Sequence, residues 1–319
     1  MAVVLAALLV RDTSLATEAG IRWLLVGGLI LLVGARGAFL TLSTAVVLAL
    51  AVLVLQPAVI HRERSFFGVT EVLRPDGATQ TTLMNGTTVH GIQSTDPAKA
   101  DLPTAYYNRV GPFGDVFRMV DGTGPKAIGV VGLGAGALTP YLQRGSTMTY
   151  YEIDPVVAAV ASDPRFFTFL SDAPTRPGIV LGDARLSLQS VPDASFDMLF
   201  IDAFSSDAVP THLLTTEAYA TYSRVVKPGG FVITHIPNRY YDLAPAVGAA
   251  LDANHLNGVI RVFAGDKAAG ATPTILTVGA RAAGDLQPLR DAGWQPLVPT
   301  VPPMTDDFMD ILRFLRPLW

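Results

Sequence analysis

The sequence predicts an α/β fold with a mostly parallel sheet, preceded by β-hairpins and by apolar N-terminal helices. Three observations lead to this class. From about residue 126 onward, short apolar runs alternate with helix-compatible segments, which is the pattern of a parallel sheet covered on both faces. Residues 65–90 hold β-branched or alternating runs broken by turn-forming dipeptides. Residues 1–60 contain long apolar stretches with only five charged side chains.

The composition is more apolar than that of an ordinary soluble domain. Of 319 residues, 50% are hydrophobic and 16% are charged, against about 25% charged in typical soluble domains. The net charge is −4, and because residues 1–60 hold three basic and two acidic side chains, the rest of the chain is mildly acidic. An acidic body argues against a nucleic-acid partner, which requires a basic face. The chain has no cysteine and its five histidines are scattered, so neither a disulfide nor a metal site is expected.

Residues 1–60 are predicted to form transmembrane helices in the lipid bilayer. Residues 38–60 are an uncharged run of about 23 residues, enough to cross roughly 30 Å of hydrocarbon, and residues 21–33 form a shorter apolar run. A buried pair of helices is the alternative. Arg36 stands alone in the turn between the runs, whereas the outer flanks are more basic, with Arg11, Arg22, Arg62 and Arg64. The positive-inside rule then puts the following domain in the cytoplasm.

Residues 61–120 predict a small β-hairpin domain with a lid loop. The dipeptides Asp76-Gly77 and Asn85-Gly86 are turn signals between strand-like runs. Residues 93–108 form a polar, proline-broken loop that carries Tyr106 and Tyr107. Such a loop in front of a nucleotide-binding fold often forms its lid, and a plain surface loop is the alternative.

The α/β domain, residues 121–285, opens on a glycine-rich turn. An apolar strand at residues 128–131 is followed by Gly132, Gly134 and Gly136, and the next predicted strand ends in Glu152. Glycines permit a tight turn and a close approach of a ligand to the backbone. An acid at the tip of the second strand can accept hydrogen bonds from ribose hydroxyls. This order predicts a nucleoside-type ligand, and a tight strand–helix turn without a ligand is the alternative.

The remaining elements of this domain follow in alternating order. We predict helices at residues 137–144, 155–161 and 217–226, and strands at residues 178–181, 196–201, 231–235 and 275–278. Gly136, Glu152, Asp183 and Asp202 fall at predicted strand ends or in the turns after them. Ligands of parallel sheets bind at that edge. The C-terminal tail, residues 286–319, is predicted to hold a helix at residues 308–315.

Three acids and a glycine turn, without the lysine of a phosphate-binding loop, favour an adenosine-type ligand over a nucleoside triphosphate. Asp183 is suited to the adenine amino group and Glu152 to the ribose. Asp202 is suited to bind a cationic amine, or to take its proton as it attacks an electrophile. A cap of the loop backbone is the alternative for Asp202 and for Asp207.

The C-terminal acids have two readings. Thr305 or Asp306 is expected to cap the helix at residues 308–315. The alternative is that Asp306 and Asp307 reach over the cleft and hold an amine.

These motifs resemble those of spermidine synthases, the polyamine aminopropyltransferases. The resemblance covers about residues 65–280, and its motifs lie at residues 91–96, 132–136, 152–154, 182–183, 196–202 and 227–230. More closely, the chain resembles the membrane-fused spermidine-synthase-like proteins of bacteria. The resemblance implies a Rossmann-like methyltransferase-type domain in a multi-pass protein of the inner membrane. Family members are often homodimers, and the same is expected here.

The resemblance also implies a reaction. Decarboxylated S-adenosylmethionine would donate an aminopropyl group to an amine such as putrescine, and methylthioadenosine would leave. Gln93 would lie near this co-substrate, Glu152 on its ribose and Asp183 at its adenine. Asp202 matches the family acid that deprotonates the attacking amine. The expected contacts of the amine itself are Tyr106, Tyr107 and Asp207.

The chain departs from the family pattern in the amine pocket. Ala135 stands where spermidine synthases carry an acid that meets the amine of the co-substrate. The family's Tyr-x-Glu segment has no counterpart here, with Tyr106 or Tyr107 as a stand-in, and Asp207 comes two residues later than the family's second acid.

Two other functions fit the same fold. Ala135 favours a methyltransferase that uses intact S-adenosylmethionine, because an acid at that position would repel the methionine carboxylate. A non-catalytic sensor, which binds an adenosyl ligand and signals through the helices, is the third reading.

Overall fold

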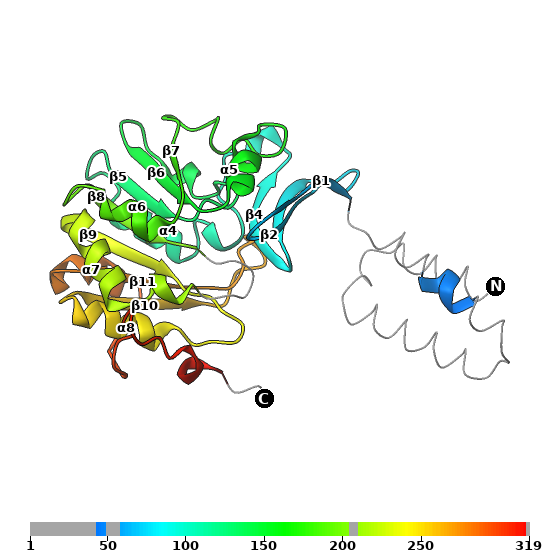
Figure 1. Cartoon of the computed structure of the whole chain (residues 1–319). Helices are drawn as coiled ribbons and strands as arrows, with labels where there is room; N and C mark the ends of the chain where they lie inside the picture. Colours follow the sequence, from blue (N-terminus) through cyan, green and yellow to red (C-terminus); the bar gives the residue numbers. More distant parts are fainter. Residues whose placement is uncertain (1–42, 49–57, 204–209, 317–319) are drawn as a thin grey trace. The chain divides into compact units, whose positions relative to one another are not determined.

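The computed structural model describes residues 43–48, 58–203 and 210–316 (Figure 1). The chain divides into two units, Met1–Ala58 and Val59–Trp319, and of the first unit the structure describes chiefly a helical segment at residues 43–48. The predicted span at residues 21–33, and most of the one at residues 38–60, therefore lie outside the described residues. None of the helices in the described part combines the length and apolar character needed to cross a bilayer.

The second unit begins with a four-stranded antiparallel sheet. Its strands are β1 (Val59–Ser65), β2 (Gly68–Leu73), β3 (Gln80–Asn85) and β4 (Thr88–Ser94), paired in that order. The predicted hairpins are therefore confirmed. The predicted apolar span was wrong at its end, because Val59 and Ile60 belong to β1. This strand pairs with β2 along its length, and Arg62 forms a cross-strand ion pair with Glu71.

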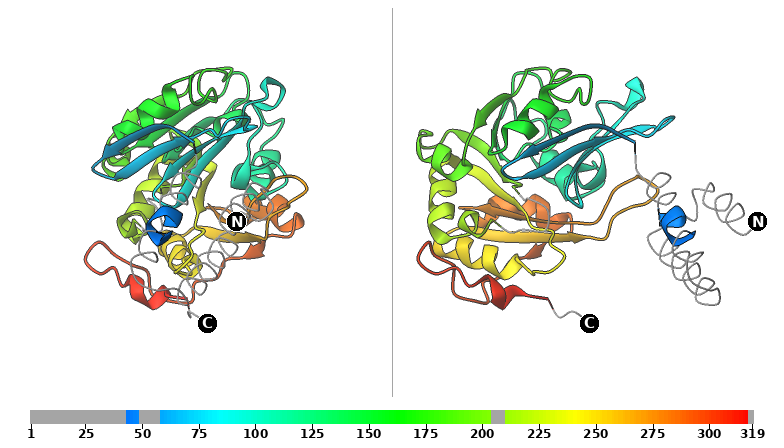
Figure 2. Two further views of the ribbon diagram at one scale, coloured as in Figure 1. Left: turned by 90° about the vertical axis from the view of Figure 1, so that its right-hand side faces the viewer. Right: turned by 45° about the vertical axis from the view of Figure 1, so that its right-hand side comes forward.

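An eight-stranded mixed sheet forms the body of this unit (Figures 1 and 2). Its order is β12-β10-β11-β9-β8-β5-β6-β7, and β5 to β9 are parallel whereas β11 is antiparallel to both neighbours. The strands are β5 (Ala127–Val131), β6 (Thr147–Glu152), β7 (Gly178–Leu181), β8 (Phe196–Ile201), β9 (Val226–His235), β10 (Asn257–Phe263), β11 (Thr274–Ala280) and β12 (Gln295–Pro296).

This arrangement confirms the Rossmann-like, methyltransferase-type fold predicted from the sequence. The strand order reverses between β5 and β8, and such a switch point opens a crevice at the carboxyl ends of the strands. Gly132 follows β5 and Asp202 follows β8, so both lie at this crevice.

Helices cover both faces of the sheet (Figure 2). They are α4 (Pro112–Met119), α5 (Pro155–Ser162), α6 (Ala184–Gln189), α7 (Thr216–Val225), α8 (Ala244–Ala253) and α9 (Gln287–Asp291). Strand β8 shows how the two faces separate. Met198 and Phe200 pack in the cluster that contains α4 and α9, whereas Leu199 and Ile201 pack in the cluster of α6, α7 and α8. This is the alternation of side chains expected of a strand that is buried on both faces.

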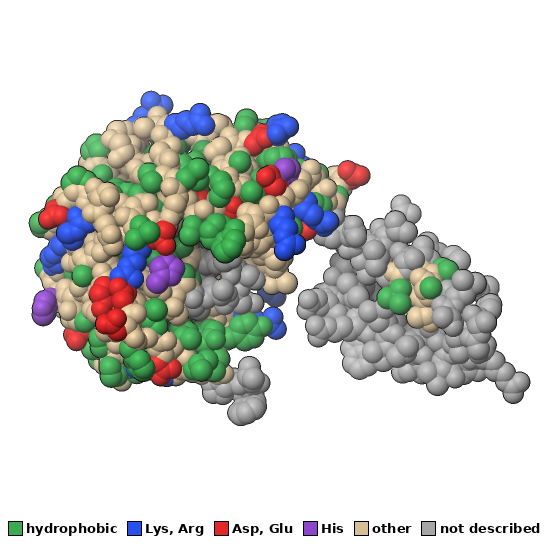
Figure 3. Space-filling model, in the orientation of Figure 1, with side chains coloured by type: hydrophobic (Ala, Val, Ile, Leu, Met, Phe, Trp, Pro, Cys, Tyr) green, Lys and Arg blue, Asp and Glu red, His purple; other side chains and the backbone are tan. Residues whose placement is uncertain are grey.

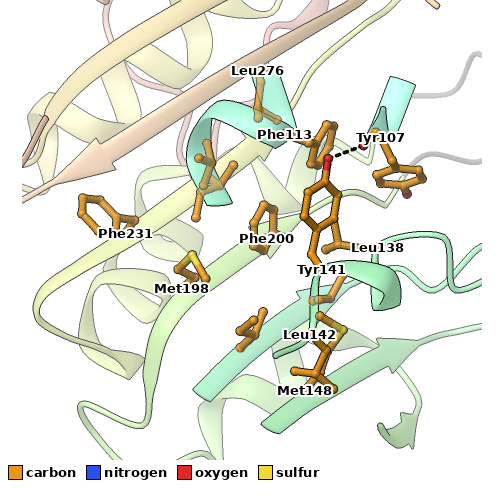
Figure 4. Close-up of a cluster of buried hydrophobic side chains, with 14 of the residues drawn as sticks. Tyr107, Phe113, Leu138, Tyr141, Leu142, Met148, Met198, Phe200, Phe231 and Leu276 are labelled. Atoms are coloured by element: carbon orange, nitrogen blue, oxygen red, sulfur yellow. Dashed lines mark hydrogen bonds between the residues drawn. The ribbon is translucent and has the colours of Figure 1, made fainter. Parts of the chain in front are cut away.

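Figure 4 shows the first of these clusters. Phe113 of α4 stacks on Phe200 of β8, with ring centroids 6.0 Å apart. The hydroxyl of Tyr141 donates a hydrogen bond of 2.6 Å to the carbonyl oxygen of Tyr107. The segment that carries Tyr107 is therefore fixed to the core of the α/β domain.

The hairpin sheet packs on the α/β domain through a third apolar cluster. Val72 and Leu83 of the hairpins meet Ala135 of the glycine turn and Val156 of α5. Gln93 adds a polar bridge, because its amide donates to the carbonyl of Ala100 and the hydroxyl of Thr168 and accepts from the Thr168 N–H. The glycine turn thus lies at the junction of the two sheets.

Two predicted helices were wrong. Residues 137–144 contain only the 3-10 turn η4 (Thr139–Tyr141), because Pro140 has no N–H to donate within an α-helix. Residues 308–315 contain only η7 (Ile311–Phe314). Asp306 does not cap a helix there, since its carboxylate pairs with Arg185 and accepts from the Thr215 hydroxyl. The sequence pattern also predicts neither α8 nor β10.

The burial of β8 predicts that replacing a leucine of this strand will destabilise the protein far more than replacing an exposed leucine. Leu199 is fully buried, whereas Leu312 is 66% exposed. Leu199→Ala should lower the free energy of unfolding by about 2–5 kcal/mol, because it leaves a cavity in the core. Leu312→Ala, the control, should change it by less than about 0.5 kcal/mol. Urea denaturation measures both, and equal effects would contradict this assignment of the core.

Candidate active site

A cavity of about 290 Å³ lies between the hairpin sheet and the carboxyl ends of the parallel strands. The hairpin sheet contributes Phe67, Thr70, Leu83, Met84, Asn85 and His90 to its lining. The α/β domain contributes residues 131–134, 151–154, 183–184, 202–203 and 212–213, together with Val157 and Pro210. The cavity therefore occupies the crevice that the strand order predicts.

The glycine turn is held in place by two backbone carbonyls. Gly132 (φ +90°) packs so closely on Asp202 that an added Cβ would lie 2.2 Å from the carbonyl oxygen of Asp202. At Gly134 (φ +53°) the same atom would lie 2.4 Å from the carbonyl oxygen of His90. The next residue, Ala135, donates its N–H to this His90 oxygen at 3.2 Å. Glycine is thus required at both positions by the protein's own backbone, and the turn also lines the cavity.

Glu152 ties the second parallel strand to the glycine turn. Its carboxylate accepts hydrogen bonds from the N–H groups of Leu133 (2.9 Å) and Asp154 (2.8 Å), and the residue is 7% exposed. Burial raises the pKa of Glu152, and the two backbone donors oppose that effect. A carboxylate has about four acceptor positions, so Glu152 retains capacity for ribose hydroxyls.

Asp183 caps helix α6 and also lines the cavity. Its Oδ1 accepts from the N–H groups of Arg185 and Leu186, and its Oδ2 lies 3.6 Å from Nε2 of His212. Arg185 in turn pairs with Asp306, so the C-terminal segment braces this wall.

Asp202 is held in place by hydrogen bonds from two other side chains. Its Oδ2 accepts from the hydroxyl of Tyr107, its Oδ1 lies 2.6 Å from Nδ1 of His235, and its side chain is 9% exposed. Nε2 of His235 lies 2.6 Å from the hydroxyl of Thr274. Burial by itself would raise the pKa of Asp202, but the charge and hydrogen bond of His235, the Tyr107 hydroxyl and the charge of His90 together hold it below its usual range. Asp202 is therefore an ionised carboxylate at neutral pH.

Tyr106 and Tyr107 lie beside Asp202, although neither belongs to the described lining of the cavity. They lie in the 3-10 turn η3 (Ala105–Tyr107), and Tyr106 stacks on His235 with ring centroids 4.7 Å apart. Burial and the charge of Asp202 raise the pKa of Tyr107, so its hydroxyl remains a donor. The reading of this segment as a plain surface loop was wrong, since Tyr107 is buried.

The structure brings together most of the residues predicted from the sequence. Gly132, Gly134, Glu152, Asp183 and Asp202 line the cavity. Gly136 (φ +80°) packs on Leu170, and Gln93 bridges Ala100 and Thr168, so neither belongs to the described lining. Asp207 lies outside the described residues. The contact of Gln93 with a co-substrate stays a prediction.

The sequence patterns missed several polar residues of the site, among them His90, His235 and Thr274. His90 lines the cavity, and His235 and Thr274 stand behind Asp202. One signal was present in the sequence, because His235 is the last residue of a predicted parallel strand, next to the strand that ends before Asp202.

The side chain of Ala135 packs on the hairpin sheet, and not where it could meet an amine of the co-substrate. A Cβ added to Gly91 would lie 2.4 Å from the Cβ of Ala135, and Ala135 is fully buried in the cluster with Val72 and Leu83. A larger side chain would therefore enter the junction with the hairpin sheet.

The charge of the lining is acidic. Glu152, Asp154, Asp183 and Asp202 are its carboxylates, and the described lining contains no Lys or Arg. No group of three or more potential metal ligands occurs in the described part of the chain. On the face shown in Figure 3, the described basic, acidic and apolar side chains are interspersed.

Comparisons with known proteins bear on this site. The family model "Methyltransferase domain" matches residues 130–234. A polyamine aminopropyltransferase of Vibrio vulnificus is 30% identical over 125 residues, which are 37% of this chain and 40% of that protein. A probable spermidine synthase from Corynebacterium glutamicum superposes with a TM-score of 0.56 at 17% identity, over 76% of this chain and 92% of that one. Over part of its length the chain is thus similar to a polyamine aminopropyltransferase, and it shares the fold of a probable spermidine synthase.

A second relative points to the alternative. A putative O-methyltransferase of Mycolicibacterium vanbaalenii is 29% identical over 117 residues, which are 35% of this chain and 48% of that protein. The chain therefore matches less than half the length of either curated relative. The structural likeness concerns the fold alone, and the narrower placement in the membrane-fused branch stays a prediction.

The glycine turn offers a test with a matched control. Gly134→Ala should displace the turn from His90 and weaken the binding of S-adenosylhomocysteine by about tenfold or more, which is about 1.4 kcal/mol. Gly124→Ala is the control, since Gly124 also has a positive φ (+86°) and an added Cβ would meet nothing within 4 Å. Isothermal titration calorimetry measures both affinities, and equal weakening would show that backbone strain alone is responsible.

The orientation of Ala135 predicts the outcome of restoring the family acid. Ala135→Asp should lower the free energy of unfolding by about 3 kcal/mol or more, because it buries an unpaired carboxylate. Ala283→Asp places the same side chain at an exposed position and is the control. Thermal unfolding by circular dichroism measures both. A stable Ala135→Asp protein with a new affinity for amines would contradict the orientation described here.

Proposed function

We propose that this chain transfers an aminopropyl group from decarboxylated S-adenosylmethionine to an amine acceptor, with Asp202 as the base for that amine. The similarities support an enzyme of the S-adenosylmethionine-dependent transferase class. One observation carries the finer proposal. An ionised, buried carboxylate faces the same cavity as the glycine turn and Glu152, at the switch point of the sheet.

The charge of the cavity supports this choice of substrates. Decarboxylated S-adenosylmethionine carries a sulfonium and an ammonium group, and a polyamine precursor is also a cation. A cavity lined by four carboxylates, with no Lys or Arg in its described lining, attracts such ligands. Intact S-adenosylmethionine carries a carboxylate in addition, which this lining would disfavour.

The geometry around Asp202 supports a role in amine binding. Each of its oxygens accepts one hydrogen bond from the protein, from Tyr107 or from His235, and each oxygen retains a further acceptor position. A rigid carboxylate of this kind can hold an ammonium group in line with the carbon that is transferred. Such positioning accounts for a large share of the rate in a two-substrate reaction.

A methyltransferase is the second candidate. The matched domain model and the similarity to a putative O-methyltransferase support it as well as they support the first. Ala135 gives it no special support, because its Cβ packs on Gly91 within a buried apolar cluster. The non-catalytic sensor, the homodimer, membrane anchoring and a cytoplasmic catalytic domain stay predictions.

Asp202→Asn tests the proposal directly. The variant should lose at least about 100-fold in kcat, since an amide can neither pair with the ammonium nor accept its proton. Its affinity for methylthioadenosine should change by less than about threefold, because Glu152 and Asp183 hold the other end of the ligand. Mass spectrometry would detect products from decarboxylated S-adenosylmethionine with a panel of amines.

Asp172→Asn is the control for this variant, since Asp172 is exposed and lies outside the cavity lining. It should keep the activity of the wild-type protein. Unchanged turnover in Asp202→Asn would rule out the proposed role of this residue. Methylated products formed from intact S-adenosylmethionine would decide for the second candidate.

A further inference from the structure

His90 occupies an unusual place in the hairpin sheet. In the pairing of β3 with β4, Leu83 lies opposite Gly91, whereas Met84 lies opposite Val89. His90 is therefore the extra residue of a β-bulge. Bulges bend a strand and redirect a side chain, and they are frequent beside active sites. Here the bulge residue is one of the six hairpin residues that line the cavity.

The imidazole of His90 has an unused polar atom. Its Nε2 is buried and has no hydrogen-bond partner among the described residues. The hydroxyl of Thr70, which lies on β2 and also lines the cavity, is in the same condition. A buried polar group without a partner costs about 1–3 kcal/mol. Two such groups in the wall of one cavity indicate that a polar part of a ligand completes their hydrogen bonds.

The backbone of His90 is fixed by the glycine turn. Its carbonyl accepts the N–H of Ala135 and packs on Gly134. The imidazole is also near enough to Asp202 for each group to influence the pKa of the other. His90 thus stands beside the turn and lines the same cavity as the Asp202 carboxylate.

We propose that His90 is a second catalytic residue of this site, whose Nε2 takes the proton that the acceptor amine loses when it attacks the transferred carbon. This inference rests on the proposed function but moves the role of base from Asp202 to His90, so that Asp202 binds the ammonium group as its ion partner. An ammonium group has three N–H bonds, so Asp202 and His90 can each engage one of them.

The step balances without any further reagent. The nitrogen forms a bond to the carbon attached to the sulfonium, and the electrons of the carbon–sulfur bond pass to sulfur, which leaves as a neutral thioether. The proton lost by the nitrogen converts neutral His90, protonated on Nδ1, into an imidazolium ion. Water then removes that proton when the products leave.

The ionisation of the two residues suits this division of roles. Asp202 is a weak proton acceptor, since its pKa is held below the usual range. Burial lowers the pKa of His90, with the charge of Asp202 opposing, so its imidazole is neutral at pH 7. An imidazole is ordinarily a stronger proton acceptor than a carboxylate, which favours His90 over Asp202 as the base.

His90→Gln tests the proposal, because glutamine keeps a polar group near the position of Nε2 but does not accept a proton. At pH 7.5 its kcat should fall by about 100-fold. The KM of the amine and the affinity for methylthioadenosine should change by less than about threefold. The deficit should shrink toward pH 10, where the amine loses its proton to solvent. Thermal unfolding would check that the variant is folded.

The pH profile of kcat/KM separates catalysis from binding. The wild-type rate should fall in acid as His90 gains a proton, at a pH below the ordinary range of histidine because burial lowers the pKa of His90, and His90→Gln should lack this acid limb. The other titratable groups of the cavity lining are Tyr151, Glu152, Asp154, Asp183, Asp202 and His212. His212 is the other histidine of this lining, so His212→Gln is the matched control and should keep the acid limb.

His255→Asn is a further control, since His255 is exposed, has a positive φ (+56°) that asparagine tolerates, and precedes β10, which contributes no residue to the cavity lining. It should leave both kcat and the pH profile unchanged. An unchanged kcat in His90→Gln, or a weaker affinity with an intact acid limb, would overturn the role of His90 alone. A wild-type protein that yields no product with any amine would overturn the proposed function, and the role of His90 with it.

Discussion

The close contact of the glycine turn with two backbone carbonyls is the constraint on which the rest of the site depends. Gly132 packs on the carbonyl of Asp202, and Gly134 packs on that of His90. The first contact joins β5 to β8, and the second joins the α/β domain to the hairpin sheet. Because no side chain beyond hydrogen fits at either position, the two sheets approach closely enough to enclose a cavity. The glycines therefore position the protein's own acids and imidazole as well as any ligand.

The structure separates the acids of the cavity by what surrounds them. Glu152 accepts two backbone N–H groups, and Asp183 accepts two more at the start of α6. Asp202 instead accepts from the side chains of Tyr107 and His235. The backbone donors hold Glu152 and Asp183 in orientations suited to accept hydrogen bonds from neutral hydroxyl and amino groups. Side-chain donors keep the third ionised in a buried place, where an ion pair with a cation is strong.

Much of this site could be predicted from the sequence, because parallel strands place their carboxyl ends at one edge. Glu152, Asp183 and Asp202 each follow an apolar run, and that alone located them. His90 could not be found in this way, since its direction depends on a bulge that appears only when β4 pairs with β3. The orientation of Ala135 depends on Gly91, 44 positions earlier in the numbering, and the role of Asp306 depends on Arg185. Contacts between residues far apart in the sequence produce no local sequence pattern from which they could be predicted.

The central claim is that an acidic cavity binds a ligand with an adenosyl sulfonium group and an amine but no carboxylate. Isothermal titration calorimetry of the wild-type protein with decarboxylated and with intact S-adenosylmethionine tests it most directly. The account predicts that the decarboxylated form binds at least about tenfold more tightly, which is about 1.4 kcal/mol. Tighter binding of intact S-adenosylmethionine by the same margin would contradict it.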